Sequence, residues 1–294
     1  MTQDIGLIGL GLAGRAIATS LIRAGFSVHG YDTAPEALRA AATLGVATVD
    51  VAGDILDRTA VIVLSLPDSD VVTEVLWGQG GIGDLLPEGA LILDTTTGRP
   101  SDAQSNNGRL ARHEVRYVDV TLSGSSDQIA AGTVTALIGD AEQSADYRRI
   151  VSAFASELFF LGNPGDGCLA KLVTNHVMGL NRAALAEGLA LGIKAGMDPE
   201  PLLQVLRSSA AYSRVIDIKG SRMVRGEFDP ASRIRQHAKD VGLIVQLAEQ
   251  VGAKTPLERV HEDLLRSAMD YGWGDLDNAA IIKVYIDEAP DDTD

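Results

Sequence analysis

The sequence predicts a doubly wound α/β domain with a parallel sheet, followed by an all-helical domain. To about residue 162, short β-rich runs alternate with helical segments, and such repetition implies parallel strands joined by crossovers. After Asn163-Pro164-Gly165-Asp166-Gly167 only helical patterns follow. The length of 294 residues also suits about two domains. We expect one domain over 1–163 and the other over 164–294.

The strands of the first domain are expected where short apolar runs are bounded by turn residues. They are Ile5–Ile8, Ser27–Tyr31, Ala60–Ser65, Ala90–Asp94, Arg116–Asp119, Val134–Ile138 and Leu158–Phe160. The helices expected between them are Ala13–Arg23, Pro35–Thr43, Ser69–Leu76, Ser101–Arg112 and Ala141–Ala155.

The second domain is expected to open with a long helix over about 168–195, because no turn signal precedes Gly196. Further helices are expected over Pro199–Ser208, Arg214–Met223, Ile234–Val251 and Pro256–Tyr271. One face of the long helix is too apolar for solvent, which predicts a buried interdomain or subunit contact. That face carries Leu172, Ala183, Leu185, Ala190 and Leu191. The acidic tail Asp287–Asp294 is expected to fray.

Composition narrows the class of protein. A hydrophobic fraction of 46% with 22% charged residues suits packed cores and argues against disorder. A net charge of −15 disfavours nucleic acid and anionic membranes as partners. The single cysteine, Cys168, fits a reducing compartment, and the five histidines lack ligand spacing, so we expect no metal site. Without a signal peptide or a membrane-spanning apolar run, the chain is expected to be soluble and cytoplasmic.

A glycine fingerprint follows the first expected strand, in the run Gly9-Leu10-Gly11-Leu12-Ala13-Gly14. Gly9 permits the strand-to-helix turn, Gly11 leaves room for a pyrophosphate, and Gly14 lets the helix pack close to the strand. The helix N-terminus then offers free N–H groups to the phosphates. The pattern predicts a dinucleotide site of the Rossmann type; a plain glycine turn is the alternative.

Asp32 directly follows the second expected strand, where this fingerprint requires an acidic residue. A carboxylate there accepts hydrogen bonds from the adenosine ribose and repels a 2′-phosphate, whereas an NADP site favours a nearby arginine. The turn Tyr31-Asp32-Thr33-Ala34-Pro35 holds no basic residue. The sequence therefore favours NAD over NADP.

Lys171 and Asn175 lie four residues apart on the long helix and share one of its faces. A lysine partly desolvated in a cleft beside a cationic nicotinamide can have its pKa lowered toward working pH and act as a general acid/base. The asparagine can hold both lysine and substrate in place. Most helical lysines are solvated surface charges, so the spacing alone leaves that alternative open.

Two further segments point toward a substrate. Ser123-Gly124-Ser125 come just after an expected strand, at the edge where doubly wound folds bind ligands, and offer hydroxyl and N–H donors to a carboxylate. A plain turn is equally open there. Lys239-Asp240 lie inside an expected helix, where the alternative is an ordinary exposed pair.

Five motifs in order give the chain a resemblance to the β-hydroxyacid dehydrogenase family, which includes 3-hydroxyisobutyrate dehydrogenase, tartronate semialdehyde reductase and L-threonate dehydrogenase. The resemblance covers nearly the whole chain. The motifs are the glycine fingerprint, Asp94-Thr95-Thr96-Thr97-Gly98-Arg99-Pro100, Asp119 to Gly132-Thr133, Gly165-x-Gly167-x-x-x-Lys171-x-x-x-Asn175, and Lys239-Asp240-Val241-Gly242-Leu243.

The resemblance implies an NAD-dependent oxidoreductase that moves a hydride between nicotinamide and a small β-hydroxy acid such as 3-hydroxyisobutyrate, tartronate semialdehyde or glycerate, or threonate. It implies Lys171 as general acid/base, with Asn175 and Ser123 to Ser125 holding the substrate carboxylate and hydroxyl. Leu66-Pro67 and Thr97 would line the cofactor near its nicotinamide end. Lys239 would close over cofactor and substrate, with Asp240 beside it. A homodimer or homotetramer is expected.

The chain departs from the family pattern at three places. Ser125 replaces the second glycine of Ser-Gly-Gly, Thr174 replaces the first of two asparagines, and Pro230-Ala231-Ser232 replaces Pro-Gly-Phe. These changes leave the identity of the hydroxy acid open. The alternatives are an imine reductase, although that group generally lacks a lysine at the position of Lys171, and a non-catalytic dinucleotide-binding protein of the same fold.

Overall fold

A computed structural model describes residues 3–141 and 145–286. The expected fraying of Asp287–Asp294 lies outside these residues. The chain divides into two compact units, Met1–Lys171 and Leu172–Asp294, and each is described by itself below.

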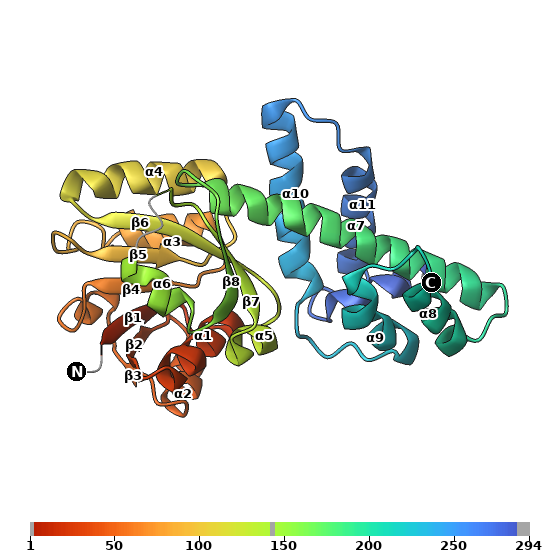
Figure 1. Cartoon of the computed structure of the whole chain (residues 1–294), viewed down its shortest axis with the longest axis horizontal. Coiled ribbons are helices and arrows are strands. Elements are labelled where there is room, and N and C mark those ends of the chain that lie inside the picture. The colour runs from red at the N-terminus through yellow and green to blue at the C-terminus, as the bar shows by residue number, and fades with distance from the viewer. Residues whose placement is uncertain (1–2, 142–144, 287–294) are drawn as a thin grey trace, which may run out of the picture. The chain divides into compact units, whose positions relative to one another are not determined.

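In the described part of unit 1, eight strands form one sheet in the order β3-β2-β1-β4-β5-β6-β7-β8, with helices on its faces (Figure 1). The strands are β1 Asp4–Ile8, β2 Ser27–Tyr31, β3 Ala47–Thr48, β4 Val61–Leu64, β5 Leu91–Asp94, β6 Arg116–Ser123, β7 Val134–Ile138 and β8 Ala155–Phe160. The helices are α1 Leu12–Arg23, α2 Pro35–Ala42, α3 Ser69–Trp77, α4 Pro100–Leu110, α5 Ser126–Ala131 and α6 Ala145–Val151. This architecture confirms the predicted α/β class.

Apolar side chains alternate between the two faces of the sheet, as the two-residue period of a strand requires. Ile5 and Leu7 of β1 pack into the core beneath α1, α5 and α6, whereas Ile8 packs into the opposite core beneath α3 and α4. The first six strands pair in parallel. The carboxyl ends of β1, β4 and β5 therefore meet at one edge of the sheet, which is where such folds bind ligands.

The sheet is not parallel throughout, because β7 runs antiparallel to β6. A parallel crossover needs a dozen or more residues, and residues 124–133 are too few to supply one. The predicted strand over Arg116–Asp119 is also too short: β6 continues to Ser123 because Val120–Ser123 pair with β7.

Most other boundaries differ from the expected ones by one or two residues, whereas β8 begins three residues earlier than expected. The short strand β3, the helices α5 and α12 and the 3-10 helices were not expected. The expected helix Ala141–Ala155 is helical over Ala145–Val151, and Ala155 instead begins β8, where it is buried in the core.

Unit 2 is helical in its described residues, as the sequence predicts. Its elements are α7 Asp166–Lys194, whose first residues belong to unit 1, α8 Pro199–Ser208, the π-helix η3 Ile216–Gly220, α9 Ser221–Arg225, α10 Ile234–Val251, α11 Pro256–Asp270, the 3-10 helix η4 Asn278–Ile282 and α12 Lys283–Ile286. Within the described residues, no helix combines the length and the hydropathy needed to cross a membrane.

The apolar face predicted for α7 is buried except at one position. Leu172, Ala183, Leu185 and Ala190 are buried. Leu191 is 72% exposed, so it lies outside the face that is buried in the single chain, and its burial in a subunit contact stays a prediction. Positions 190 and 191 are adjacent and therefore point about 100° apart on a helix, which places only one of them toward the core.

A buried carboxylate, Asp277, organises the segment before α10. It accepts hydrogen bonds from Lys219 Nζ at 2.7 Å and from the N–H groups of Ala231 and Ser232 at 3.1 Å. Arg222 forms a further ion pair with it at 3.1 Å. These contacts fix the segment that carries the Pro230-Ala231-Ser232 departure from the family pattern.

Candidate active site

The glycine fingerprint forms the turn between β1 and α1. Gly9 has φ +97°, a region that favours glycine, and a Cβ there would collide with the carbonyl oxygen of Ser65. A Cβ at Gly14 would collide with the carbonyl of Gly9. At Gly11, by contrast, a Cβ would meet nothing within 4 Å. The turn is therefore packed against protein at Gly9 and Gly14 and open at Gly11, which fits a pyrophosphate approaching the start of α1.

The exposed part of this turn is Gly11, Leu12 and Ala13. Leu10 is buried, and its N–H donates to Asp32 Oδ2 at 2.7 Å. The N–H groups at the start of α1 lack partners inside the helix, as at every helix N-terminus, and are available to phosphate oxygens. Leu10 therefore contributes packing rather than a phosphate donor.

Asp32 lies at the end of β2, where the sequence predicts the ribose ligand. Besides Leu10, the Ala34 N–H donates to its Oδ1 at 2.8 Å. Each carboxylate oxygen has a second lone pair, so ribose hydroxyls can still bind there. Thr33 beside it is exposed.

Leu66, Pro67 and Thr97 follow the carboxyl ends of β4 and β5. The Leu66 N–H donates to Thr96 Oγ1 at 3.1 Å, which ties the two connections together. Pro67 is exposed, and Leu66 and Thr97 are half-buried. The structure thus brings these three residues to the same edge as the fingerprint.

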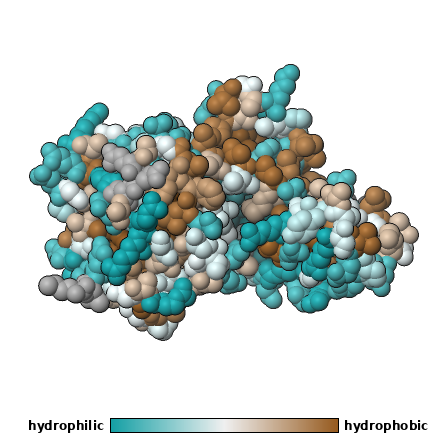
Figure 2. Space-filling model, in the orientation of Figure 1, coloured by the Kyte–Doolittle hydropathy of each residue, from teal (hydrophilic) through white to brown (hydrophobic). Residues whose placement is uncertain are grey.

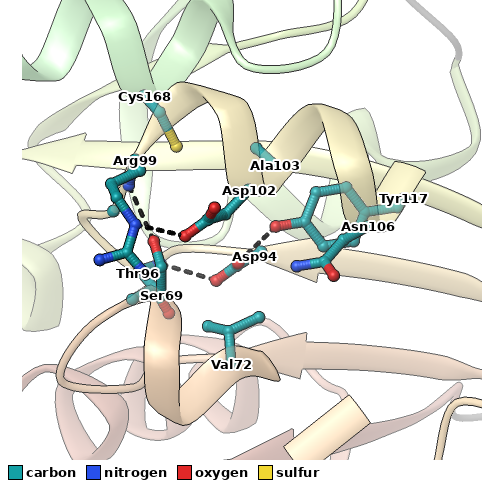
Figure 3. A pocket seen from close by; sticks show the side chains of 11 residues that line it. Ser69, Val72, Asp94, Thr96, Arg99, Asp102, Ala103, Asn106, Tyr117 and Cys168 are labelled. Carbon is teal, nitrogen blue, oxygen red and sulfur yellow. Dashed lines mark hydrogen bonds and ion pairs between the residues drawn. The ribbon is translucent and has the colours of Figure 1, made fainter. Parts of the chain in front are cut away.

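Behind this edge lies a small cavity lined by Asp94, Thr96, Arg99, Tyr117 and Cys168 (Figure 3). It leaves about 10 Å³ for the centre of a water molecule, which is room for one water at most. Asp94 accepts hydrogen bonds from the Tyr117 hydroxyl at 2.5 Å and from the Thr96 N–H at 2.9 Å.

Burial determines the ionisation of two groups around this cavity. Burial raises the pKa of Asp94 to about 6. Burial and the nearby carboxylates also raise the pKa of the Cys168 thiol well above its ordinary value, so Cys168 is a protonated packing residue. Arg99 closes one side, donating to Asp102 at 2.6 Å.

Asp119 was expected only as the first residue of the motif that runs to Gly132-Thr133, and in the structure its carboxylate binds the first turn of α7. It is fully buried and accepts hydrogen bonds from the N–H groups of Gly165 and Cys168, both at 2.8 Å. Thr121 adds a bond from its hydroxyl to the Gly167 carbonyl at 2.8 Å. Strand β6 thereby fixes the first turn of α7, from which Lys171 projects one turn later.

Lys171 and Asn175 are both buried on α7, with 7% and 3% of their surfaces exposed. This burial sets Lys171 apart from an ordinary solvated helical lysine. Within unit 2, Asn175 Nδ2 donates to Asp240 Oδ2 at 2.9 Å, and Lys239 Nζ lies 3.0 Å from Asp240 Oδ1. Lys239 and Asp240 therefore belong to a partly buried network rather than to an exposed pair.

The loop of Ser123, Gly124 and Ser125 joins β6 to α5. Ser125 is the N-cap of α5: its hydroxyl accepts from the Gln128 N–H at 3.3 Å, and its own N–H donates to Gln128 Oε1 at 2.9 Å. The donor set for a carboxylate is therefore smaller than the sequence predicts, because the Ser125 N–H already has a partner.

Unit 1 thus gathers the fingerprint turn, Leu66, Pro67, Thr97, the Ser123–Ser125 loop and Lys171 around the carboxyl ends of its strands, and unit 2 holds Asn175, Lys239 and Asp240 together. Sequence reasoning missed the carboxylate role of Asp119 and the role of Gln128. The second had a signal, since Ser125-x-x-Gln128 is a capping-box pattern. Among the described residues, no three His, Cys, Asp or Glu side chains are grouped as metal ligands.

Two family models together match most of the chain. Residues 4–162 match the NAD-binding domain of 6-phosphogluconate dehydrogenase, and residues 165–285 match the NAD-binding domain of NADP-dependent 3-hydroxyisobutyrate dehydrogenase. The two matched regions meet at the predicted change from α/β to helical character.

Individual relatives agree with these matches. The chain is 30% identical to an L-threonate dehydrogenase of Cupriavidus necator, over 97% of both chains. It is 26% identical to an NAD-dependent L-serine dehydrogenase of Pseudomonas aeruginosa, over 96% of this chain and 98% of the relative. The solved 3-hydroxyisobutyrate dehydrogenase of Salmonella typhimurium superposes with a TM-score of 0.86 at 26% identity, covering 96% of this chain and 99% of that one.

Proposed function

The chain belongs to the β-hydroxyacid dehydrogenases, a family of NAD(P)-dependent 3-hydroxyacid dehydrogenases and reductases, and on that premise we propose that it transfers a hydride between NAD and a small β-hydroxy acid, with Lys171 as general acid/base. The observation that carries the proposal is the burial of Lys171 and Asn175 one turn apart on α7, after a turn that Asp119 holds in place.

The proposed cofactor is NAD. The open space at Gly11 and the free start of α1 suit the pyrophosphate. Asp32 would accept hydrogen bonds from the adenosine ribose, and the exposed Thr33 offers no cation to a 2′-phosphate. Leu66, Pro67 and Thr97 would contact the cofactor near its nicotinamide end. When bound, the nicotinamide ring accepts or supplies the hydride.

Lys171 would take the proton from the substrate hydroxyl during oxidation and return it to the carbonyl oxygen during reduction. An acid/base must lie within hydrogen-bond reach of the proton it moves, and a fixed side chain is more effective than a mobile one. The burial of Lys171 restricts its side chain, and the anchored first turn of α7 fixes its Cα.

Asn175 would orient the substrate as a hydrogen-bond acceptor. An ionised carboxylate is acceptor-only, so Asp240 requires the Nδ2 side of the Asn175 amide to face it. Asn175 Oδ1 then faces away, is buried, and has no hydrogen-bond partner among the described residues. A buried acceptor of this kind costs free energy until a donor reaches it. A donor of the substrate other than the reacting hydroxyl would fill this position, because the single proton of that hydroxyl goes to Lys171.

The substrate carboxylate would bind at Ser123, Gly124 and Ser125, with Lys239 and Asp240 completing the set of contacts to substrate and cofactor. Asp94, the last residue of β5, pairs with Asp119 of β6. Strand β6 then continues for four residues beyond Asp119. At about 3.3 Å per residue this carries the loop about 13 Å past the end of β5. The loop thus projects beyond the edge at which the dinucleotide would bind.

We also propose that the active form is a homodimer or homotetramer. Val173 and Val177 of α7 are each 53% exposed, and Leu191 is 72% exposed. Figure 2 shows further apolar side chains around the α10–α11 turn, where Val251, Leu257 and Val260 are each more than half exposed. Apolar surface of this extent favours burial against another chain.

The experiment that tests the reaction measures reduction of NAD⁺ and NADP⁺ by the purified full-length chain with a panel of β-hydroxy acids. The proposal expects saturable turnover of at least one acid, with a higher kcat/KM for NAD. A panel of cyclic imines with NADH and NADPH runs in parallel. Turnover of imines but not of hydroxy acids, or of neither, would contradict it.

A further inference from the structure

A buried carboxylate of α11, that of Glu258, contacts the long helix α7, and none of the five sequence motifs includes it. The Glu258 side chain is fully buried. Its Oε2 lies 2.7 Å from Nδ1 of His176, the residue directly after Asn175. Because an ionised carboxylate only accepts hydrogen bonds, Nδ1 of His176 is the donor. The contact holds the imidazole ring of α7 against α11.

One turn of α7 is therefore held from two directions. Consecutive residues of an α-helix point about 100° apart. The Asn175 amide donates to Asp240 of α10 at 2.9 Å, whereas His176 donates to Glu258 of α11. Either bond alone would leave the turn free to rotate about a single contact. The two together fix both its rotation about the helix axis and its height between α10 and α11.

The next turn of α7 lies close to the same two helices at Gly179. A Cβ there would lie 2.6 Å from Cε1 of His261 on α11 and 2.8 Å from Nε2 of His237 on α10. These two buried imidazole rings pack against each other, with their centroids 5.1 Å apart. The glycine thus lets α7 approach both helices closely. Interiors packed to this degree transmit a displacement of one element to its neighbours.

Glu258 depends on His176 for its pairing. Within the described residues, the hydrogen bond from His176 is the one that its carboxylate accepts. Its Oε1 is buried without a partner there, and Nδ1 of His261 lies 3.8 Å from Oε2. The buried Arg182 interacts with Glu258 through its charge. A buried carboxylate that loses its close donor is strongly unfavourable, so the pair holds His176 firmly in place.

We infer that Glu258 is a positioning residue for the proposed reaction: by holding His176 it fixes the turn of α7 that carries Asn175. The inference rests on the proposed function and extends it to α11, a helix that supplies no contact to substrate or cofactor in that proposal. Neither Glu258 nor His176 moves a proton of the substrate; they determine the position of Asn175 Oδ1. A displacement of about 1 Å at such a group can lower turnover about 100-fold.

Two substitutions of His176 separate positioning from other roles. His176→Leu removes the donor and should lower kcat for the best hydroxy acid about tenfold or more, with the dissociation constant for NAD unchanged. His176→Asn carries Nδ2 on Cγ, where histidine carries Nδ1, so it can donate to Glu258 from the same place and should keep kcat within about threefold of the wild type. Arg259→Leu, which removes an exposed ion pair with Glu249 between α10 and α11, is the matched control and should leave kcat unchanged.

Two double variants separate position from stability. His176→Leu leaves the charge of Glu258 buried without its donor, so its unfolding temperature should fall. Adding Glu258→Gln removes that charge at nearly unchanged volume, and the unfolding temperature should rise again while kcat stays low. Adding His176→Leu to Asn175→Ala should lower kcat by less than about a further threefold, because the effect of His176 acts through Asn175.

The outcomes separate the inference from the reaction it rests on. Wild-type kcat in His176→Leu, an equal loss in His176→Asn, recovery of kcat together with the unfolding temperature, or a full further loss on top of Asn175→Ala would each overturn the inference and leave the proposed reaction standing. Where His176→Leu alone does not fold, its combination with Glu258→Gln takes its place in the comparison. Turnover of no hydroxy acid by the wild type would instead remove the proposed reaction.

Discussion

Asp240 acts on the proposed chemistry through the amide it orients. Its Oδ2 accepts from Asn175 Nδ2 at 2.9 Å, and Lys239 Nζ lies 3.0 Å from its Oδ1. The carboxylate would therefore decide which end of the Asn175 amide is left for the proposed substrate. This role depends on the charge of Asp240, because a neutral amide could accept or donate.

Asp240→Asn should therefore impair catalysis although it is almost isosteric. The Asn175 amide could then turn over, and half of its orientations would present a donor where the substrate needs an acceptor. We expect kcat/KM to fall about 10- to 100-fold, the range that corresponds to one charge-assisted hydrogen bond. Asp263→Asn, at an exposed ion pair of the same unit, is the control. Unchanged kinetics in Asp240→Asn would contradict the orienting role.

Asp32 holds the fingerprint turn and would also bind ribose. Both carboxylate oxygens accept backbone N–H groups, so its removal should weaken the turn as well as the selectivity. We expect Asp32→Ala combined with Thr33→Arg to raise the NADP-to-NAD ratio of kcat/KM by about 100-fold or more, because a repelling carboxylate is exchanged for a phosphate ligand. Asp57→Ala, at an exposed position of unit 1, serves as the control. A preference that stays with NAD would show that Asp32 does not select the cofactor.

Strand β6 and helix α7 act together at the catalytic end of unit 1. Asp119 and Thr121 of β6 bind residues 165–168, and the same strand continues into the Ser123–Ser125 loop. One element therefore positions both the proposed acid/base and the proposed carboxylate site. Its neighbour β5 ends in Asp94, whose pairing with Tyr117 and Thr96 supports the connection that carries Thr97.

Asp94 should give unit 1 a characteristic pH dependence. Its pKa is raised from 3.8 to about 6 by burial, so between these values the folded state holds a proton that the unfolded state has lost. The free energy of unfolding therefore falls as pH rises through this window, by up to about 3 kcal/mol, and is flat above it. Asp94→Asn should remove that fall.

The measurement is denaturant unfolding of unit 1 at pH 4 to 7.5, followed in the wild type, in Asp94→Asn and in Asp57→Asn as the exposed control. The free energy of unfolding of Asp94→Asn minus that of the wild type should increase as pH rises and become constant near pH 7. Parallel curves for the two proteins would contradict the raised pKa.

The sequence predicts the position of a helix or strand well where a single local pattern determines it. Apolar alternation places Ser27–Tyr31 and Val134–Ile138 correctly, and Pro199 and Pro256 mark helix starts. The prediction of secondary structure is wrong between Asp119 and Thr133, where three weak signals overlap. The end of β6 is a strand only because it pairs with β7. The helix α5 has only six residues, and its capping box lies inside a segment that resembles a binding motif. Pairing between distant segments is not visible in local patterns.

The same distinction holds for the candidate site. Glycine positions and the four-residue spacing of Lys171 and Asn175 are local, so the sequence predicts where they lie. The bonds of Asp119 to Gly165 and Cys168, of Asn175 to Asp240, and of Asp277 to Lys219 join residues far apart in the chain. No periodicity encodes them, and they appear only once the fold is formed.

For the molecule as a whole, the exposed apolar side chains on α7 predict self-association. Multi-angle light scattering of the purified chain at micromolar concentration should give at least twice 30.9 kDa. Val173→Glu with Val177→Glu, at positions that are each 53% exposed, should shift the mass toward the monomer, because charges in an apolar interface are unfavourable. A wild-type mass of 30.9 kDa would contradict the assembly.

The reaction itself depends most directly on Lys171. We expect Lys171→Ala to retain NAD binding, since the fingerprint lies in another segment, while kcat for the best hydroxy acid falls by a factor of about 10² to 10⁴, the usual contribution of a positioned acid/base. Lys171→Arg should be almost as damaging, because a guanidinium does not release its proton at working pH. Steady-state kinetics paired with a measured NAD dissociation constant tests this: a large loss of kcat with unchanged binding is the predicted result, and near wild-type turnover by Lys171→Ala would contradict the account.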